Sequence, residues 1–372
     1  MNKENKTIVV SAVNLRKGGT LTILRQCLKY LSNLATEHGY RVVALVHRRD
    51  LCDYEGIEYI EMPHIVGSWG RRLWCEYVTM RKVSKRLSPV YLWFSLHDTS
   101  PRVVAERQAV YCHTSFPYYR WNIRDFRMDY KIPLFSMFTK YAYRINVHSN
   151  NYLVVQQNWL REGLSRMLGV KRSKLIVAPP QRVRMDSAPS VKPNDRYTFF
   201  YASTPDCHKN FETLCEAARL LEKELGSKRY KVVLTVNGEE NRYSRWLYGK
   251  WGDVKTVDFV GYLSKDKLYE YYSSADCLVF PSKVETWGLP ITEFMEVSVD
   301  KPMLLADLPY AHETAAGASK VCFFDCENPI DLKDRMRELI ENRCDALTPV
   351  PNQQIEDPRA NSWEELFNIL LN

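Results

Sequence analysis

Residues 275–307 have the sequence ADCLVFPSKVETWGLPITEFMEVSVDKPMLLAD. The apolar run at 277–280 is typical of a strand that is buried on both faces. A polar loop containing Glu285 follows, and Pro290 stands where proline commonly opens a helix. A second apolar run near 302–305 completes the order strand, helix, strand. This order predicts one unit of a parallel sheet.

The same alternation continues along the rest of the chain. It begins with an apolar run at 7–13, the pair Gly18-Gly19, a helical pattern over 23–34 and a second strand at 41–46. Further strands are predicted near 57–61, 90–94, 109–112, 174–178, 197–201, 230–236, 254–260, 276–281, 302–305 and 320–324. The pattern is interrupted between residues 179 and 194. We therefore predict an α/β protein with two doubly wound, Rossmann-like domains.

The charges divide along the same line as the domains. Residues 1–186 hold 30 Lys and Arg against 14 Asp and Glu, a net charge of +16, whereas residues 187–372 have a net charge of −8. The composition, 45% hydrophobic with 15 glycines among 372 residues, excludes a disordered or collagenous chain. We place an N-terminal domain at 1–187, a C-terminal domain at 188–345 and a tail at 346–372. The helix at 363–371 in that tail begins with a capping box.

The cysteines and the apolar runs indicate the compartment. Ten cysteines are scattered along the chain without any C-x-x-C pair, which favours buried thiols in a reducing environment. The longest apolar candidate, 132–147, contains Lys140 and Arg144, so it does not predict a membrane span. We therefore expect a cytoplasmic protein.

Two carboxylates near the start of one helix suggest the ligand. Glu285 lies in the loop at the carboxyl end of a parallel strand, and Glu293 lies one turn into the following helix. Ligands of open α/β sheets bind at such strand ends. The helix start offers free N–H groups at Gly288 and Leu289 to a phosphate, whereas carboxylates repel phosphate and accept hydroxyl groups. A ligand that has hydroxyls on both sides of a diphosphate is a nucleotide sugar.

The stretch E-T-W-G-L-P-I-T-E at 285–293 resembles the paired-glutamate motif of glycosyltransferase family 4, the retaining, nucleotide-sugar-dependent enzymes with the GT-B fold. Other segments are similar to this family as well: 306–313 (ADLPYAHE), 208–211 (HKNF), 259–262 (FVGY) and 361–365 (NSWEE). The resemblance is strong over 197–325 and weaker in the N-terminal half. It implies two doubly wound domains that face each other across a cleft, with the C-terminal helix returning to the N-terminal domain.

The resemblance also implies a role for individual residues. Glu293 would bind the ribose hydroxyls, Glu285 would bind hydroxyls of the transferred sugar, and Lys209 would neutralise the diphosphate. Gly18 and Gly19 would allow the chain to approach the diphosphate closely. The donor-binding residues implied in this way are Gly18, Gly19, Thr20, Ser203, Lys209, Gly261, Tyr262, Glu285, Gly288, Leu289 and Glu293. The catalytic residues are His113, Lys209 and Glu285.

His113 follows a short apolar run that ends at the carboxyl side of a predicted strand. The resemblance suggests that this histidine faces the transferred sugar or the acceptor, and a structural histidine is the alternative. One departure from the family concerns the phosphates. Relatives carry an arginine a few residues before the lysine, but the segment 203–208 has none. Either His208 or an arginine from elsewhere takes its place, or phosphate stabilisation is weaker than usual.

The family relation implies a retaining transfer of a hexose-type sugar to a hydroxyl of a glycan acceptor. The leaving phosphate receives the acceptor's proton, and we expect no metal and no other cofactor. A nucleotide-sugar epimerase or hydrolase on the same fold is the first alternative. A basic nucleic-acid-binding protein is the second, and no recognisable nucleic-acid module supports it.

The basic N-terminal half suggests a second partner. Residues 71–87 alternate basic and apolar side chains at helical spacing. This pattern fits an amphipathic helix on an anionic membrane, and it equally fits a helix packed on the core with a solvated basic face. A lipid-linked oligosaccharide acceptor in surface polysaccharide synthesis favours the membrane, with the protein at its inner face. The expected partners are therefore a nucleotide sugar, a glycan or lipid-linked acceptor and an anionic membrane, but not a nucleic acid.

Overall fold

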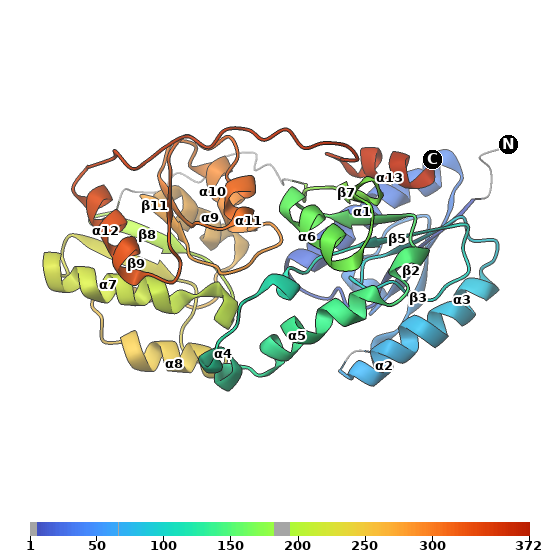
Figure 1. Cartoon of the computed structure of the whole chain (residues 1–372), viewed down its shortest axis with the longest axis horizontal. Coiled ribbons are helices and arrows are strands. Elements are labelled where there is room, and N and C mark those ends of the chain that lie inside the picture. Colours follow the sequence, from blue (N-terminus) through green and yellow to red (C-terminus); the bar gives the residue numbers. More distant parts are fainter. Residues whose placement is uncertain (1–5, 66, 182–193) are drawn as a thin grey trace. The chain divides into compact units, whose positions relative to one another are not determined.

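The computed structural model describes residues 6–65, 67–181 and 194–372 (Figure 1). The chain divides into two compact units. The first unit comprises residues 1–114, 138–181 and 355–372, and the second comprises 115–137 and 182–354. The predicted boundary between residues 187 and 188 lies outside the described residues.

The first unit is a parallel sheet of seven strands in the order β3-β2-β1-β4-β5-β6-β7. Its strands are β1 (Thr7–Ala12), β2 (Arg41–Val46), β3 (Ile57–Glu61), β4 (Leu92–Ser95), β5 (Arg107–Tyr111), β6 (Tyr152–Val155) and β7 (Leu175–Val177). Its helical segments are α1 (Gly18–His38), α2 (Trp69–Trp74), η3 (Cys75–Thr79), α3 (Met80–Arg86), α6 (Asn158–Leu168) and α13 (Trp363–Leu371). β6 was not predicted from the sequence. The strand order reverses between β1 and β4, as in doubly wound folds.

The second unit contains a parallel sheet of six strands in the order β10-β9-β8-β11-β12-β13. Its strands are β8 (Tyr197–Tyr201), β9 (Tyr230–Leu234), β10 (Val257–Phe259), β11 (Cys277–Phe280), β12 (Met303–Ala306) and β13 (Val321–Phe324). Its helical segments are α4 (Ile123–Met128), η7 (Cys207–Lys209), α7 (Phe211–Leu225), α8 (Arg242–Trp251), α9 (Lys265–Ser274), α10 (Leu289–Val297), α11 (Pro309–Thr314) and α12 (Pro329–Ile340). Helix α5 (Lys131–Arg144) runs across the division at Met137. The prediction of two doubly wound sheets is confirmed.

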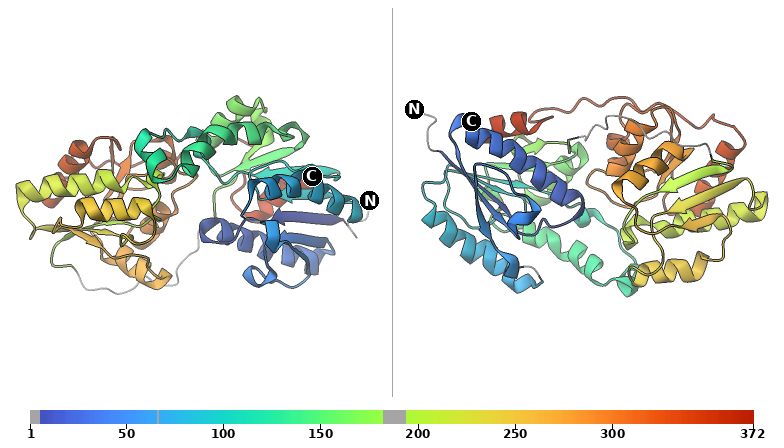
Figure 2. Two further views of the ribbon diagram at one scale, coloured as in Figure 1. Left: turned by 90° about the horizontal axis from the view of Figure 1, so that it is seen from below. Right: turned by 180° about the vertical axis from the view of Figure 1, so that it is seen from behind.

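Burial on both faces explains why apolar and polar residues do not alternate along β1. Ile8 and Val10 face a core that includes Leu28 of α1, which crosses the sheet in Figure 2. Val9 faces a second core that includes Val83 of α3. A strand between two helical layers must be apolar on both sides.

The helical segments at 71–87 belong to this second core. Cys75, Met80 and Val83 are buried in it, whereas Lys82 and Lys85 are exposed. Of the two alternatives for this stretch, the structure therefore supports the helix that packs on the core and has a solvated basic face. Leu73 and Trp74, at the start of the stretch, stay 41% and 64% exposed.

The segment 115–137 packs with the second unit, whereas the sequence analysis counted it within an N-terminal domain at 1–187. The ring of Phe116 lies 5.0 Å from that of His208, and Arg124 forms an ion pair with Glu212 of α7. These contacts join residues about 90 positions apart, and no change of composition marks residue 115. The tail also divides differently, since residues up to 354 stay with the second unit.

All ten cysteines are free thiols, and nine of them are buried. Burial raises the pKa of Cys52 to about 11 and that of Cys75 to about 12, so these thiols stay protonated at neutral pH. None of the described helices is long and apolar enough to cross a membrane.

The C-terminal helix returns to the first unit, as expected. Phe367 of α13 is fully buried, and its ring lies 5.4 Å from that of Tyr30 and 5.6 Å from that of Phe94. These contacts place the last turns of the chain in the same core as β1 and α1. The helix is therefore part of the first unit's fold rather than an appendage.

Phe367→Ala should lower the free energy of unfolding of the first unit by about 3–5 kcal/mol, because it opens a cavity between α1 and β4. A urea titration followed by circular dichroism measures this change. Asn368→Ala, at an exposed position on the same helix, should change it by less than about 0.5 kcal/mol. Equal effects of the two substitutions would show that α13 does not pack on this core.

Candidate functional site

Lys209 and Glu285 meet at the carboxyl edge of the second sheet. Lys209 ends η7, which follows β8, and Glu285 lies in the loop after β11. These two strands are neighbours at the point where the strand order reverses, which is where doubly wound sheets bind ligands. Lys209 Nζ lies 2.6 Å from Glu285 Oε1, and the two side chains are only 15% and 13% exposed. Two residues that the sequence placed in one site are thus in direct contact.

Asn210 determines the path of the chain after Lys209. Its backbone is left-handed, with φ 58° and ψ 41°, a conformation that asparagine tolerates better than most residues. Its side-chain amide donates to the carbonyl oxygens of Pro281 (3.0 Å) and Cys326 (2.7 Å). Thr213 donates from Oγ1 to the amide oxygen of Asn210 at 2.9 Å. One side chain therefore ties the turn after β8 to the turns after β11 and β13.

A second connection runs through Tyr201, the last residue of β8. Its hydroxyl donates to the carbonyl oxygen of Lys209 at 2.8 Å and lies 3.0 Å from Ser282 Oγ. Because that single proton is used for Lys209, Ser282 is the donor in the second bond. Tyr310 of α11 donates to the carbonyl oxygen of Ser282 at 2.7 Å. The two loops that bear Lys209 and Glu285 are thus held in register by buried hydroxyls.

Helix α10 begins next to this pair. Gly288 precedes it with φ 90°, and a Cβ atom there would lie 3.3 Å from Ile291 Cδ1, so both conformation and packing favour glycine. No side chain caps the helix start, which leaves the N–H groups around Leu289 to a ligand. Glu293 lies one turn further and accepts a hydrogen bond from Tyr272 at 3.0 Å. Desolvation by burial raises the pKa of Glu293, although Tyr272 and Lys265 oppose the rise.

Ser203 follows β8, and Gly261 and Tyr262 follow β10, which is separated from β8 by β9 in the same sheet. Ser203 N donates to Thr235 Oγ1 at 2.9 Å. Gly261 follows β10 with φ 74°, where a Cβ atom would lie 3.3 Å from that of Asn237. Tyr262 is 92% exposed, an unusual state for a large aromatic side chain and one that leaves its ring open to a ligand.

His208 does not supply the second cation that the sequence lacks. Its ring is buried against Phe116 and Tyr119, and desolvation holds its pKa well below the usual value, with Lys209 adding to the effect. A neutral imidazole gives no charge to a phosphate. Sequence reasoning missed two other cations that contact Glu212 in the first turn of α7, because folding alone brings them to this carboxylate. Arg124 is paired with Glu212, and Lys283 Nζ lies 3.9 Å from the same carboxylate.

In the first unit, Gly18, Gly19 and Thr20 open helix α1. Gly18 has φ 62°, and a Cβ atom added there would meet nothing within 4 Å. The helix start has no side-chain cap, and Thr20 Oγ1 donates to the carbonyl oxygen of Lys17 at 3.1 Å. The segment therefore combines open space with free N–H groups at the carboxyl end of β1.

His113 follows β5 at the same edge of the first sheet. Desolvation lowers the pKa of its ring to about 3, so the ring is neutral, and it lies edge-on to Tyr111. Neither ring nitrogen has a hydrogen-bond partner among the described residues. Its backbone N–H donates to Asp98 Oδ1. Burial raises the pKa of Asp98 to about 6, although that N–H and Arg72 oppose the rise.

Residues 184–357 match the family model described as glycosyl transferases group 1. This part of the chain, just under half of it, is similar to the group 1 glycosyl transferases. Sucrose-phosphate synthase from Thermosynechococcus elongatus is similar to 99% of this chain and 95% of its own, with 14% identity and a TM-score of 0.62. A glycosyltransferase from Rickettsia africae (91% and 88% covered, 14% identity, TM-score 0.64) is also similar. Anabaena Alr3699/HepE in complex with UDP-glucose is similar as well, with 90% of each chain covered, 12% identity and a TM-score of 0.63.

These structural likenesses show the GT-B fold of glycosyltransferases. A search of curated protein sequences found no match. The matched segment contains Lys209, Glu285 and Glu293, whereas Gly18 and His113 belong to the first unit. The individual roles of all the residues implied by the resemblance stay predictions.

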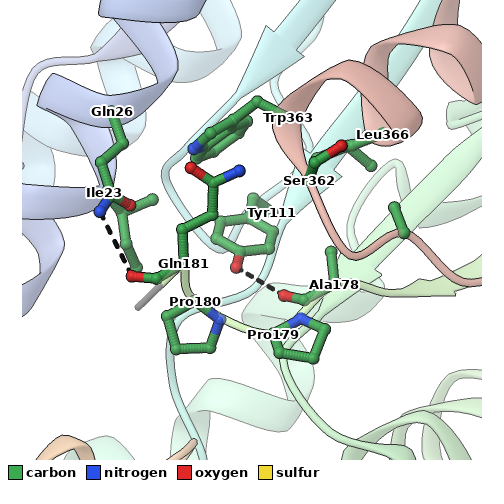
Figure 3. Close-up of a pocket in the computed structure, with 11 residues that line it drawn as sticks. Ile23, Gln26, Tyr111, Ala178, Pro179, Pro180, Gln181, Ser362, Trp363 and Leu366 are labelled. Carbon is green, nitrogen blue, oxygen red and sulfur yellow. Dashed lines mark hydrogen bonds between the residues drawn. The ribbon is translucent and has the colours of Figure 1, made fainter. Parts of the chain in front are cut away.

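Two further observations concern ligands. Among the described residues, no group of three or more His, Cys, Asp or Glu side chains is placed to hold a metal ion, and the expectation that none is needed stays a prediction. A hollow in the first unit lies between α1, β7 and the start of α13, where Tyr111 donates to the carbonyl oxygen of Ala178 (Figure 3). Its volume of about 10 Å³ has room for about one water molecule, so we assign it no ligand.

Asn210→Asp should lower the free energy of unfolding of the second unit by about 2–4 kcal/mol. The substitution keeps the side-chain shape but replaces the amide donor. The carbonyls of Pro281 and Cys326 both lose the bond from Asn210 and face a carboxylate, although Cys326 keeps the bond from Thr213 Oγ1 at 3.0 Å. Chemical denaturation of the full chain measures the loss. Asn194→Asp is the control, because that amide bonds only to Ser274 O and Lys231 in the hydrogen bonds of the described structure. A smaller loss for Asn210→Asp than for Asn194→Asp would contradict the role given to Asn210.

Proposed function

We propose that the chain is a retaining glycosyltransferase that moves a hexose-type sugar from a nucleotide-diphosphate sugar to a hydroxyl group of a glycan acceptor. The acceptor is lipid-linked, the reaction belongs to surface polysaccharide synthesis, and the protein acts at the inner face of the membrane, which it contacts through its basic N-terminal half. The observation that carries the transfer is the Lys209–Glu285 pair, which lies within the segment that matches the group 1 glycosyl transferases. Alr3699/HepE, with the same fold, was crystallised with UDP and glucose.

The donor side of the proposal follows from the charges. Lys209 is paired with the carboxylate of Glu285, and a diphosphate offers it a more highly charged partner. When the diphosphate takes Lys209, the Glu285 carboxylate is released to accept hydroxyl groups of the sugar. Glu293 then accepts the ribose hydroxyls, and the uncapped start of α10 faces the phosphates.

The chemical step needs positioning more than a protein base. In a retaining transfer the acceptor hydroxyl and the leaving diphosphate lie on one face of the sugar, so the diphosphate itself takes the proton. Lys209 stabilises the negative charge that develops on the leaving group. The neutral, unpaired ring of His113 is suited to hydrogen-bond the sugar or the acceptor without adding charge. No metal enters the proposed step.

A donor panel tests the proposal. The full chain is incubated with UDP-, GDP- and ADP-sugars, and melting temperature and products are measured. We expect one nucleotide sugar to stabilise the protein. Lys209→Ala should abolish that stabilisation and lower transfer by about 10²–10³-fold, because it removes charge stabilisation from the leaving group. Lys255→Ala, at an exposed position of the same unit, should change neither quantity.

The products separate the alternatives. Transfer to an added glycan acceptor supports the proposal. Free sugar released at the same rate without an acceptor would indicate a hydrolase, and an isomerised nucleotide sugar would indicate an epimerase. Either result would overturn the transferase assignment while leaving the donor site intact.

The pH dependence of nucleotide binding tests the role of Glu293. The raised pKa means that this carboxyl takes up its proton at a higher pH than an ordinary glutamate, and the protonated form accepts ribose hydroxyls poorly. The Kd for the nucleoside diphosphate should therefore rise as the pH falls through that raised pKa. Tyr272→Phe removes a hydrogen bond that lowers the pKa, so the midpoint should move to still higher pH. Tyr269→Phe leaves that bond in place and should leave the midpoint unchanged; identical midpoints in all three proteins would exclude Glu293 from the binding site.

A further inference from the structure

Asp98 has a backbone conformation that residues other than glycine rarely adopt. It lies in the turn after β4, and its φ of 68° falls in the left-handed region. Glycine adopts this conformation readily, and asparagine tolerates it about as well as aspartate does. Strained residues persist where the surrounding structure holds them, and they gather at functional sites. The backbone alone therefore does not explain why an aspartate stands here.

The turn after β4 lies at the edge where a doubly wound sheet binds its ligands. β4 and β1 are neighbours at the point where the strand order of the first sheet reverses. His97, which is 2% exposed, connects the turns after these two strands. Its Nε2 accepts from the N–H of Val13 at 3.3 Å, and its Nδ1 lies 3.4 Å from the side-chain amide nitrogen of Asn14. Asp98 follows this buried residue directly, and all of these groups belong to the first unit.

The Asp98 side chain reaches from this turn to the turn after β5. Its Oδ1 accepts a hydrogen bond from the backbone N–H of His113. The residues on either side of it in the chain, His97 and Thr99, are buried, whereas Asp98 is half-buried. A carboxylate has about four acceptor positions, and the N–H of His113 occupies one of them. Asp98 therefore keeps capacity for a further donor, and its side chain is in part open to solvent.

The charge of Asp98 is set by burial and by groups on the segments around it. Burial raises the pKa of Asp98 to about 6. The backbone N–H that it binds, Arg72 of α2 and Tyr143 of α5 oppose this rise, and Glu76 of η3 adds to it. Cys112, after β5, also faces the carboxylate and stays a neutral thiol, because burial raises its pKa well above the ordinary value. Asp98 is therefore mostly ionised at about pH 7.5 and mostly protonated at about pH 5.

This charge decides which ligand group suits Asp98. A carboxylate repels a phosphate, whereas it accepts hydrogen bonds from hydroxyl groups, and a bond to an ionised acceptor is stronger than one between neutral groups. Lys209 and Glu285, on which the proposed donor chemistry rests, belong to the second unit. The hydroxyl groups of the acceptor are therefore the partners that the proposed reaction leaves to the first unit.

We propose that Asp98 binds a hydroxyl group of the acceptor sugar and that its carboxylate orients this sugar for the transfer. The inference rests on the proposed function and names a residue of its acceptor site. No covalent bond is made or broken at Asp98, because the hydroxyl only donates a hydrogen bond, and the proton of the reacting hydroxyl still passes to the leaving diphosphate. Glycine or asparagine would suit the backbone, but neither offers a charged acceptor, so the strained conformation serves the carboxylate.

Asp98→Asn in the full chain tests the carboxylate without disturbing the turn. The amide oxygen of asparagine still accepts from the N–H of His113, and asparagine tolerates the left-handed backbone. With the nucleotide sugar found in the donor panel held at saturation, kcat/KM for the glycan acceptor should fall by about 10–100-fold. Donor stabilisation should be unchanged. The melting temperature of the free protein should rise at about pH 7.5, because an aspartate whose pKa is raised by folding destabilises the fold above that pKa.

Asp50→Asn is the matched control, because Asp50 is an exposed aspartate in the segment after β2, at the same edge of the sheet. It should leave kcat/KM for the acceptor within about twofold of wild type. A pH profile at saturating donor adds a second readout. The kcat/KM of wild-type protein should decline as the pH falls through about 6, since a protonated Asp98 no longer offers a charged acceptor, and Asp98→Asn should lack this decline. A merely structural role of Asp98 would leave the decline in place.

Three results would overturn the inference: equal acceptor kinetics in wild type and Asp98→Asn, the same acid decline in both, or a loss of donor stabilisation in Asp98→Asn. The last result would place the residue in the donor site or in the fold. If wild-type protein transfers the sugar and Asp98→Asn does so equally well, the assignment of Asp98 fails and the proposed function holds. If wild-type protein binds no nucleotide sugar, or releases free sugar instead of transferring it, the proposed function fails and the inference falls with it.

Discussion

The carboxyl edge of the second sheet, where Lys209 and Glu285 lie, depends on the hydrogen bonds of the Asn210 side-chain amide. This amide joins the turns that follow three different strands, and it does so from a backbone conformation that few side chains accept. Lys209 Nζ and Glu285 Oε1 lie 2.6 Å apart on two separate loops. If these loops were flexible, bringing the two side chains together would cost conformational entropy, so the pair depends on both loops being fixed. The Tyr201 hydroxyl supplies the second fixed point. The geometry of the ion pair is therefore set by neutral, buried hydrogen bonds rather than by the attraction of its charges.

Desolvation decides which groups at these edges carry charge. His113 and His208 are both buried enough to be neutral at physiological pH, and the same effect raises the pKa values of Asp98 and Glu293. The second half of the sequence has a net charge of −8, so its overall field does not attract a diphosphate. Attraction must come from single groups at short range. Lys209 and the uncapped start of α10 are the groups of this kind that the predicted site contains.

Local patterns were sufficient to predict most of the fold. The runs at 7–13 and 41–46 are apolar because both faces of the sheet are covered, and this signal is visible in any window of a few residues. The turn at Lys209-Asn210 and the helix start at Gly288 were also visible, because each requires a particular residue type at a particular position. The direction that the apolar side of an amphipathic helix faces was not visible in the sequence. Periodicity at 71–87 is the same for a core-facing and a lipid-facing helix, and only the tertiary contacts of Met80 and Val83 distinguish them.

The place of the segment 115–137 in the second unit could not be predicted from the sequence for a related reason. Its assignment to the second unit depends on the ion pair of Arg124 with Glu212 and on the ring contact of Phe116 with His208. No local sequence pattern predicts these pairs. In α5 the structure buries Ser136 and Thr139 together with Tyr143, whereas Phe138 and Tyr141 are exposed. Where local preference and tertiary arrangement disagree in this way, function is a common reason for the conflict.

Under the proposed function, the paired state of Lys209 and Glu285 has a consequence for donor binding. Both side chains are already largely withdrawn from water, so most of the free energy needed to desolvate the lysine is spent during folding. A diphosphate that replaces the carboxylate exchanges one anionic partner for another and does not strip water from an exposed ammonium group. The displaced Glu285 must then find hydrogen-bond donors, since an unpaired carboxylate at this depth is unfavourable. A ligand that brings both an anion and hydroxyl groups satisfies the lysine and the glutamate together, whereas inorganic diphosphate satisfies only the first. The pair therefore favours the intact nucleotide sugar over its charged fragment.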